Sequence, residues 1–186
     1  MKKTFFELNQ NIGNLVNCKA LHAAVTKKSS GFKTFDKRDK SIDNTQWGIL
    51  GNLSSKCKMI SLYDIKRMYK LNTIDVLKID IEGGEYSLIP SIKHILKTDK
   101  PDIFLSLHPE FPYSTNKKRG LMKKLVVRLK IISNHIRLYW VLRHYKYCFD
   151  RELNSVSLFI LITQAFYKKH KNRNRYYEEI LISNTK

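Results

Sequence analysis

The 186-residue chain is long enough for one domain with a substantial core, and its 42% hydrophobic content excludes an intrinsically disordered protein. Its 35 Lys plus Arg against 16 Asp plus Glu give a formal net charge of +19, which favours contact with nucleic acid, anionic membrane or acidic substrates, or else marks a solvated basic surface. Three widely spaced cysteines, Cys18, Cys57 and Cys148, exclude a disulfide framework and a paired-cysteine zinc site, and they predict a reducing, cytoplasmic location.

The first 35 residues predict strands around a short helix. Residues 4–7 have the pattern of the end of a strand, and residues 8–10 lead into a short helix. Residues 18–25 predict the next strand, and residues 32–35 continue as a short β extension after a Ser-Ser-Gly turn. Taken without further context, Glu7 is an ordinary surface acid near a terminus.

Residues 36–56 have little apolar periodicity and predict a long loop. Trp47 lies near its middle, so this loop is either a lid that closes over a pocket or a segment that folds back on its own domain. Residues 57–61 then predict a strand, followed by a helix from Leu62 onward. Asp64 falls in the first turn of that helix, where the helix dipole favours an acid.

The central motif is a strand that runs through a two-glycine turn into a helix. Residues 74–81 form a short apolar run rich in β-branched side chains, which predicts a buried strand. Apolar side chains recur at helical spacing over residues 85–97, which predicts a helix. Ligands of open α/β sheets bind beyond the carboxyl ends of the strands, and this is where Asp80, Glu82 and Glu85 fall.

These three acids have different predicted roles. Glu85 opens the helix, where a carboxylate is favoured by the free N–H groups, so a capping role is expected rather than a catalytic one. Asp80 follows an apolar strand, where a carboxylate is costly to bury unless it binds or pairs with something, so a functional role is expected. Glu82 fits either role.

Residues 102–107 predict a second strand, parallel and adjacent to the first, because strand, turn, helix and strand follow one another as in a βαβ unit. Pro109 and Pro112 keep the next segment out of a helix. His108 therefore stands at the carboxyl end of this strand, beside the turn that carries Asp80. An imidazole there can take a proton from a hydroxyl nucleophile, although simple packing in the cleft is the alternative.

The C-terminal part begins with a long basic helix, expected over residues 117–143, which lies on an anionic membrane, contacts nucleic acid, or packs on the sheet with its basic side in water. Residues 145–149 and 177–182 predict two late strands. The longest apolar run, near residues 156–167, is too short and interrupted to span a bilayer. The predicted apolar face of the long helix comprises Leu121, Leu125, Val126, Leu129, Ile132, Ile136, Tyr139 and Trp140.

Two segments carry a resemblance to a known family. KIDIEGGEY at residues 78–86, followed by a helix and then KPDIFLSLHP at residues 100–109, resembles the Lys-x-Asp-x-Glu-Gly-x-Glu and strand-His-Pro pair of FkbM-type methyltransferases. The resemblance covers about residues 5–112, with residues 113–186 adding the basic helix and last strands to the same single domain. It implies a Rossmann-like class I α/β sheet with helices on both faces, and a methyltransferase that uses S-adenosylmethionine, mostly for O-methylation of a hydroxyl.

The resemblance also implies roles for individual residues. The segment Phe-Glu-Leu-Asn at residues 6–9 matches a family segment, commonly Phe-Glu-Pro-Asn, whose acid binds the cofactor ribose, so Glu7 and Asn9 are expected to bind S-adenosylmethionine. An ionised carboxylate is a suitable acceptor for two vicinal hydroxyls. Asp80, Glu82 and His108 are expected to hold the acceptor, a sugar or glycan, and to remove its proton.

One family element is missing from these 186 residues: a first strand followed by a glycine-rich turn that approaches the methionine part of the cofactor. In the resembled fold that strand is central, so its loss is expected to separate the sheet into halves unless these pair again. Weak cofactor binding is then expected. The alternatives are a non-catalytic binding or assembly module, and a basic protein of nucleic acid or membrane surfaces.

Overall fold

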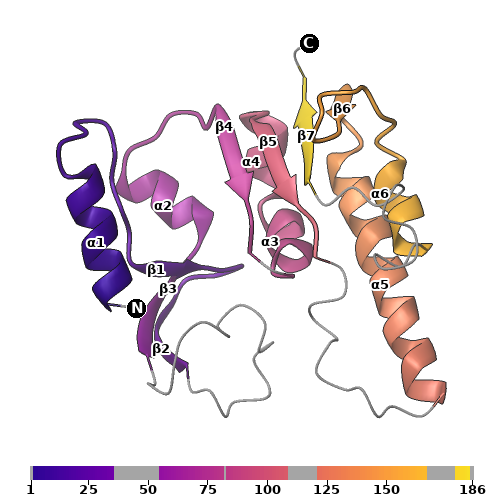
Figure 1. Ribbon diagram of the computed structural model, residues 1–186, viewed down its shortest axis with the longest axis horizontal. Coiled ribbons are helices and arrows are strands. Elements are labelled where there is room, and N and C mark those ends of the chain that lie inside the picture. The colour runs from indigo at the N-terminus through magenta and orange to yellow at the C-terminus, as the bar shows by residue number, and fades with distance from the viewer. Residues whose placement is uncertain (1, 36–54, 82, 109–120, 167–178, 185–186) are drawn as a thin grey trace.

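The computed structural model describes residues 2–35, 55–81, 83–108, 121–166 and 179–184 of the chain (Figure 1). Helices and strands are interspersed along the described chain, consistent with the α/β class. In chain order the elements are α1 (Lys2–Ile12), β1 (Ala23–Val25), β2 (Ser30–Phe35), β3 (Ser55–Ile60), α2 (Leu62–Met68), β4 (Val76–Ile79), α3 (Glu85–Ser91), α4 (Lys93–Thr98), β5 (Asp102–Ser106), α5 (Leu121–Leu142), β6 (Tyr147–Phe149), α6 (Ile160–Thr163), the 3-10 helix η2 (Gln164–Phe166) and β7 (Glu179–Ser183).

The strands form two sheets instead of one. In the first sheet the order is β1-β3-β2, with β1 parallel and β2 antiparallel to β3. In the second the order is β4-β5-β7-β6, with β4 parallel to β5 and β7 antiparallel to both of its neighbours. Among the described residues no strand joins β1 to β4, which are edge strands of their sheets. The expected separation into halves is therefore confirmed.

The N-terminal segment differs from its prediction. Residues 4–7 belong to the helix α1 and not to a strand, so that prediction was wrong. Phe5 and Ile12, two helical turns apart, are half-buried residues of this helix, and the centroid of the Phe5 ring lies 5.0 Å from that of the His22 ring. A strand needs a neighbour for its backbone groups, whereas a helix satisfies them internally. The predicted strand over residues 18–25 is likewise reduced to Ala23–Val25.

The predicted parallel pairing in the second sheet is confirmed. Leu77 of β4 pairs with Ile103 of β5, which in turn pairs with Ile182 of β7. The helix expected over residues 85–97 is divided at Ile92 into α3 and α4. Pro90 lies inside α3, where it has no N–H to donate and crowds the preceding turn, which accounts for the interruption nearby.

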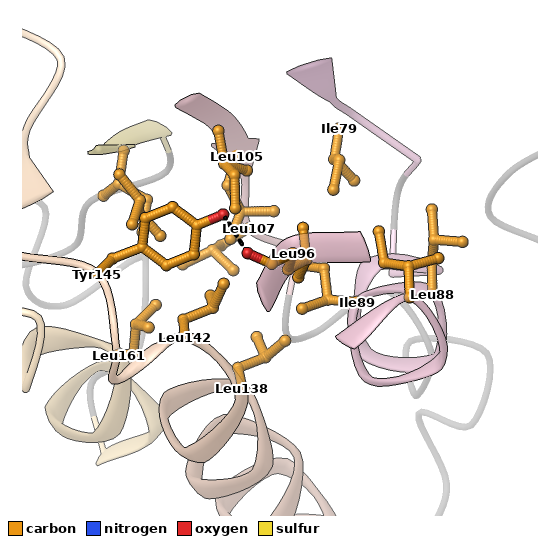
Figure 2. Packing of buried hydrophobic residues seen from close by; sticks show 14 of the residues in the cluster. Ile79, Leu88, Ile89, Leu96, Leu105, Leu107, Leu138, Leu142, Tyr145 and Leu161 are labelled. Atoms are coloured by element: carbon orange, nitrogen blue, oxygen red, sulfur yellow. Dashed lines mark hydrogen bonds between the residues drawn. The ribbon is translucent and has the colours of Figure 1, made fainter. Parts of the chain in front are cut away.

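One face of the second sheet carries the main core. Leu138 and Leu142 extend from α5 toward Ile89 of α3 and Leu96 of α4, as Figure 2 shows, and all four are buried. The opposite face exposes side chains such as Phe104. The prediction of helices on both faces therefore fails for this sheet within the described part of the chain, and the observed architecture is a mixed α/β fold with two sheets.

The long basic helix is confirmed as α5. The alternative in which its predicted apolar face packs on the sheet is wrong for most of that face, because Leu125, Val126, Leu129, Ile136 and Trp140 are exposed. The buried side chains of α5 lie on another face and comprise Ile131, His135, Leu138 and Leu142. The two late strands are confirmed as the antiparallel pair β6 and β7.

Candidate functional site

The carboxyl ends of β4 and β5 bring together three of the side chains singled out in the sequence. Asp80 directly follows β4, Glu85 begins α3, and His108 lies two residues beyond the end of β5. The Nε2 atom of His108 is 3.8 Å from Oδ1 of Asp80, and its Nδ1 atom is 3.7 Å from Oε1 of Glu85. The imidazole thus lies between two carboxylates. Glu82 lies outside the described residues.

Glu85 has a structural role at this site. Its side chain is fully buried, and its two carboxylate oxygens accept hydrogen bonds of 2.7 Å from the backbone N–H groups of Gly83 and His108. Gly83 has a φ of 101°, a left-handed conformation that a side chain would strain. The carboxylate therefore ties the turn after β4 to the segment after β5. The prediction that Glu85 is a first-turn residue is confirmed.

Asp80 borders a cavity of about 540 Å³ between the two sheets. That volume falls in the range of small-molecule sites. The Asp80 side chain is 51% exposed, so the argument from costly burial does not apply to it. The cavity is lined by β1 and the two residues after it, Ala23, Ala24, Val25, Thr26 and Lys27, and by the turn after β4 and the helix α3, through Asp80, Ile81, Gly84, Ser87 and Leu88.

These groups suit the recognition of a hydroxylated or zwitterionic small molecule. The Asp80 carboxylate can accept a hydrogen bond from a hydroxyl, and the Lys27 ammonium can contact an anionic group. The His108 side chain, 22% exposed, is able to take a proton. The described residues contain no group of three metal-ligating side chains. Lys27 had no sequence signal, because only the tertiary structure places it opposite the Asp80 turn.

Glu7 and Asn9 are not brought to this cavity. Both lie on α1 with exposed side chains, and neither is among the described residues that line the cavity. Their predicted position at a strand end was wrong, because the segment is helical. Their predicted contact with the cofactor ribose stays a prediction.

A buried histidine supports the helix that begins at the site. Nδ1 of His135 is 2.6 Å from the Leu161 carbonyl oxygen, which can only accept, so Nδ1 carries the hydrogen. Nε2 then accepts from the Tyr86 hydroxyl at 3.1 Å. Burial lowers the pKa of His135 to about 4, which keeps the imidazole neutral at pH 7. Tyr86 follows Glu85 in α3, so this contact anchors α3 to α5.

The comparisons with known proteins bear on the whole of this arrangement. A family model described as Methyltransferase FkbM domain matches residues 3–146, more than half of the chain and a span that includes the first sheet, the strands β4 and β5 and the Asp80 turn. A search of curated proteins and a search of solved structures each gave no match. The chain therefore belongs to the FkbM methyltransferase domain family.

Proposed function

We propose that this protein uses S-adenosylmethionine to methylate a hydroxyl group, with a sugar or glycan-like molecule as the acceptor. Membership in a methyltransferase family supports the reaction class. The observation that carries the choice of a hydroxyl acceptor is the position of His108 between Asp80 and Glu85, next to the cavity that Asp80 borders. A hydroxyl must lose its proton as the methyl group arrives, and these side chains provide for that loss.

The cavity suits such a cofactor in size and in the charge of its lining. S-adenosylmethionine would supply an electrophilic methyl group for in-line displacement. Lys27 would hold the carboxylate of its amino-acid end, and Ser87 would offer a further hydroxyl contact. Glu7 would contact the ribose only if the bound S-adenosylmethionine extended from the cavity as far as α1.

The side chains of the protein orient the acceptor and remove its proton. Asp80 accepts a hydrogen bond from a neighbouring hydroxyl of the sugar-like acceptor and so orients the reacting hydroxyl toward His108. His108 takes the proton while the new oxygen–carbon bond forms, and Glu85 keeps the His108 backbone in place through the bond to its N–H group. The distance of 3.8 Å between His108 and Asp80 exceeds a direct hydrogen bond and leaves room for the hydroxyl to approach both side chains.

The test is methyl transfer from labelled S-adenosylmethionine, at millimolar donor, to a panel of mono- and oligosaccharides. We expect acceptor-dependent formation of S-adenosylhomocysteine that falls by about 10²-fold or more in His108→Gln, the usual size of a general-base contribution. Asp80→Asn should also reduce it. Glu152→Gln, an exposed acid in the segment after β6, is the matched control and should leave the rate unchanged.

Two outcomes would overturn the proposal. One is a rate in His108→Gln equal to that of the wild type. The other is the absence of product with every hydroxylated acceptor, which would favour the non-catalytic binding or assembly module. The division into two sheets supports that alternative, because the described residues place no strand between the edge strands β1 and β4.

The cysteines support a proposal about location. Cys18, Cys57 and Cys148 are free thiols, as is usual in a reducing compartment. We therefore propose that the protein acts in the cytoplasm.

A further inference from the structure

The helix α5 has two apolar faces, and among the described residues only one of them is buried. Ile131, Leu138 and Leu142 are buried, and α5 packs against α3 through this inner face. In Figure 1 the beginning of α5 extends away from the second sheet. The other face is therefore available for contact outside the domain.

The second face is an exposed apolar stripe that only Ser133 interrupts. Met122 is 72% exposed, and Leu129 and Trp140 are each 57% exposed. The helical period places these side chains on one side of the helix, opposite the inner face. Contiguous exposed apolar surface is uncommon unless it binds something. We call this set the outward stripe: Met122, Leu125, Val126, Leu129, Ile136 and Trp140.

Basic side chains flank the outward stripe. The sequence of α5 contains no Asp or Glu, so no acid on this helix offsets its positive charge. At the end of the helix the Arg143 guanidinium lies 4.1 Å from the centroid of the Trp140 ring. Lys130 and Arg137, both exposed, lie beside the outward stripe on the helix, whereas Lys124 and Arg128 lie nearer the inner face.

We propose that α5 lies flat on an anionic lipid surface, with the outward stripe at the boundary between headgroups and acyl chains. A helix with an apolar stripe and a basic flank binds in this manner, since apolar burial and attraction to lipid phosphates act together. Tryptophan favours this depth because its ring is amphipathic. No helix in the described part of the chain is long and apolar enough to cross a membrane.

Charge and polarity distinguish this surface from two other occupants. Nucleic acid would pair with the lysines and arginines, but its phosphate backbone offers nothing apolar to cover six exposed apolar side chains. A second copy of the chain would cover the stripe. Pairing α5 with α5 would then place basic flanks together without an acid on either helix. An anionic lipid surface offers acyl chains that cover the apolar side chains and phosphates that attract the basic ones.

The test is co-sedimentation of the full chain with vesicles of phosphatidylcholine alone or with 30% phosphatidylserine. The chain has two tryptophans, so a Trp47→Phe background leaves Trp140 as the fluorescent reporter. We expect at least tenfold tighter binding to the anionic vesicles, a blue shift of Trp140 emission, and weakening with added salt. Leu125→Gln combined with Leu129→Gln should reduce binding at least tenfold.

The control variant is Phe104→Gln, which removes an exposed apolar side chain from the opposite face of the second sheet and should bind as the wild type does. Circular dichroism verifies that each variant is folded. The proposal is overturned by equal binding to both kinds of vesicle, or by an unshifted Trp140 spectrum. Binding to duplex DNA that the double variant retains, together with no vesicle binding, would favour nucleic acid instead. A dimer that the double variant abolishes would favour a second copy.

Discussion

Replacing Glu85 with glutamine tests how the candidate site is held together. Glutamine has nearly the same shape, but only one oxygen, so it can accept from Gly83 or from His108 and not from both. The lost bond to a charged acceptor is worth about 1.5–3 kcal/mol, and its donor is left facing an amide N–H. Removing a buried charge offsets part of this cost. We expect a net destabilisation of about 2 kcal/mol, within a range of about 1–4.

Denaturant unfolding of the wild type, Glu85→Gln and the exposed-acid control Glu152→Gln measures this difference. The transition midpoint should fall in Glu85→Gln while its slope stays constant, because the surface exposed on unfolding is unchanged. Methyl transfer should fall as well, since the bond to the His108 N–H positions the imidazole. A midpoint in Glu85→Gln equal to that of Glu152→Gln would refute the account of Glu85 as the residue that joins the two strand ends.

Three further predictions concern a buried histidine, the thiols and the cofactor. Burial lowers the folded-state pKa of His135 from 6.5 to about 4, so the unfolded chain binds a proton at His135 at a higher pH than the folded chain does. The free energy of unfolding should therefore fall by up to about 3 kcal/mol as pH falls from 6.5 toward 4. Denaturant unfolding across this pH range should show the loss, and His135→Gln should diminish it. A thiol reagent should modify exposed Cys18 quickly, and Cys57 and Cys148 only on unfolding, because burial raises the pKa of both thiols, that of Cys148 to about 11. Titration calorimetry with micromolar S-adenosylmethionine should show no saturable heat, because Glu7 does not line the cavity, and even two ribose hydrogen bonds to it, about 0.5–1.5 kcal/mol each, would fall short of the roughly 4 kcal/mol of a millimolar complex.

Each of these has a contrary outcome. A pH dependence between 4 and 6.5 that persists unchanged in His135→Gln would place the titrating group elsewhere. Rapid modification of Cys148 in the native protein would contradict its place in the core of the second sheet. A micromolar dissociation constant that Glu7→Ala abolishes would show that α1 completes a cofactor site after all.

The sequence by itself determined the unit that carries the candidate site. The β-branched run before Asp80, the two glycines and the helical spacing after Glu85 are local signals, and local signals specify a strand, a turn and a helix. The meeting of Asp80 and His108 also followed, because parallel strands of a βαβ unit end at the same edge of a sheet. The distance of 3.8 Å between these side chains is the consequence of that rule.

Tertiary structure decided what local patterns leave open. Residues 4–7 fit a strand or a helix, and the described chain offers them no strand to pair with, so they are helical. The helix α5 is apolar on two sides, and periodicity does not tell which side the sheet will cover. The position of Lys27 opposite Asp80 and the two bonds of Glu85 join residues from different elements. Such contacts depend on how the two sheets and their helices pack, because packing brings together groups that the sequence keeps apart.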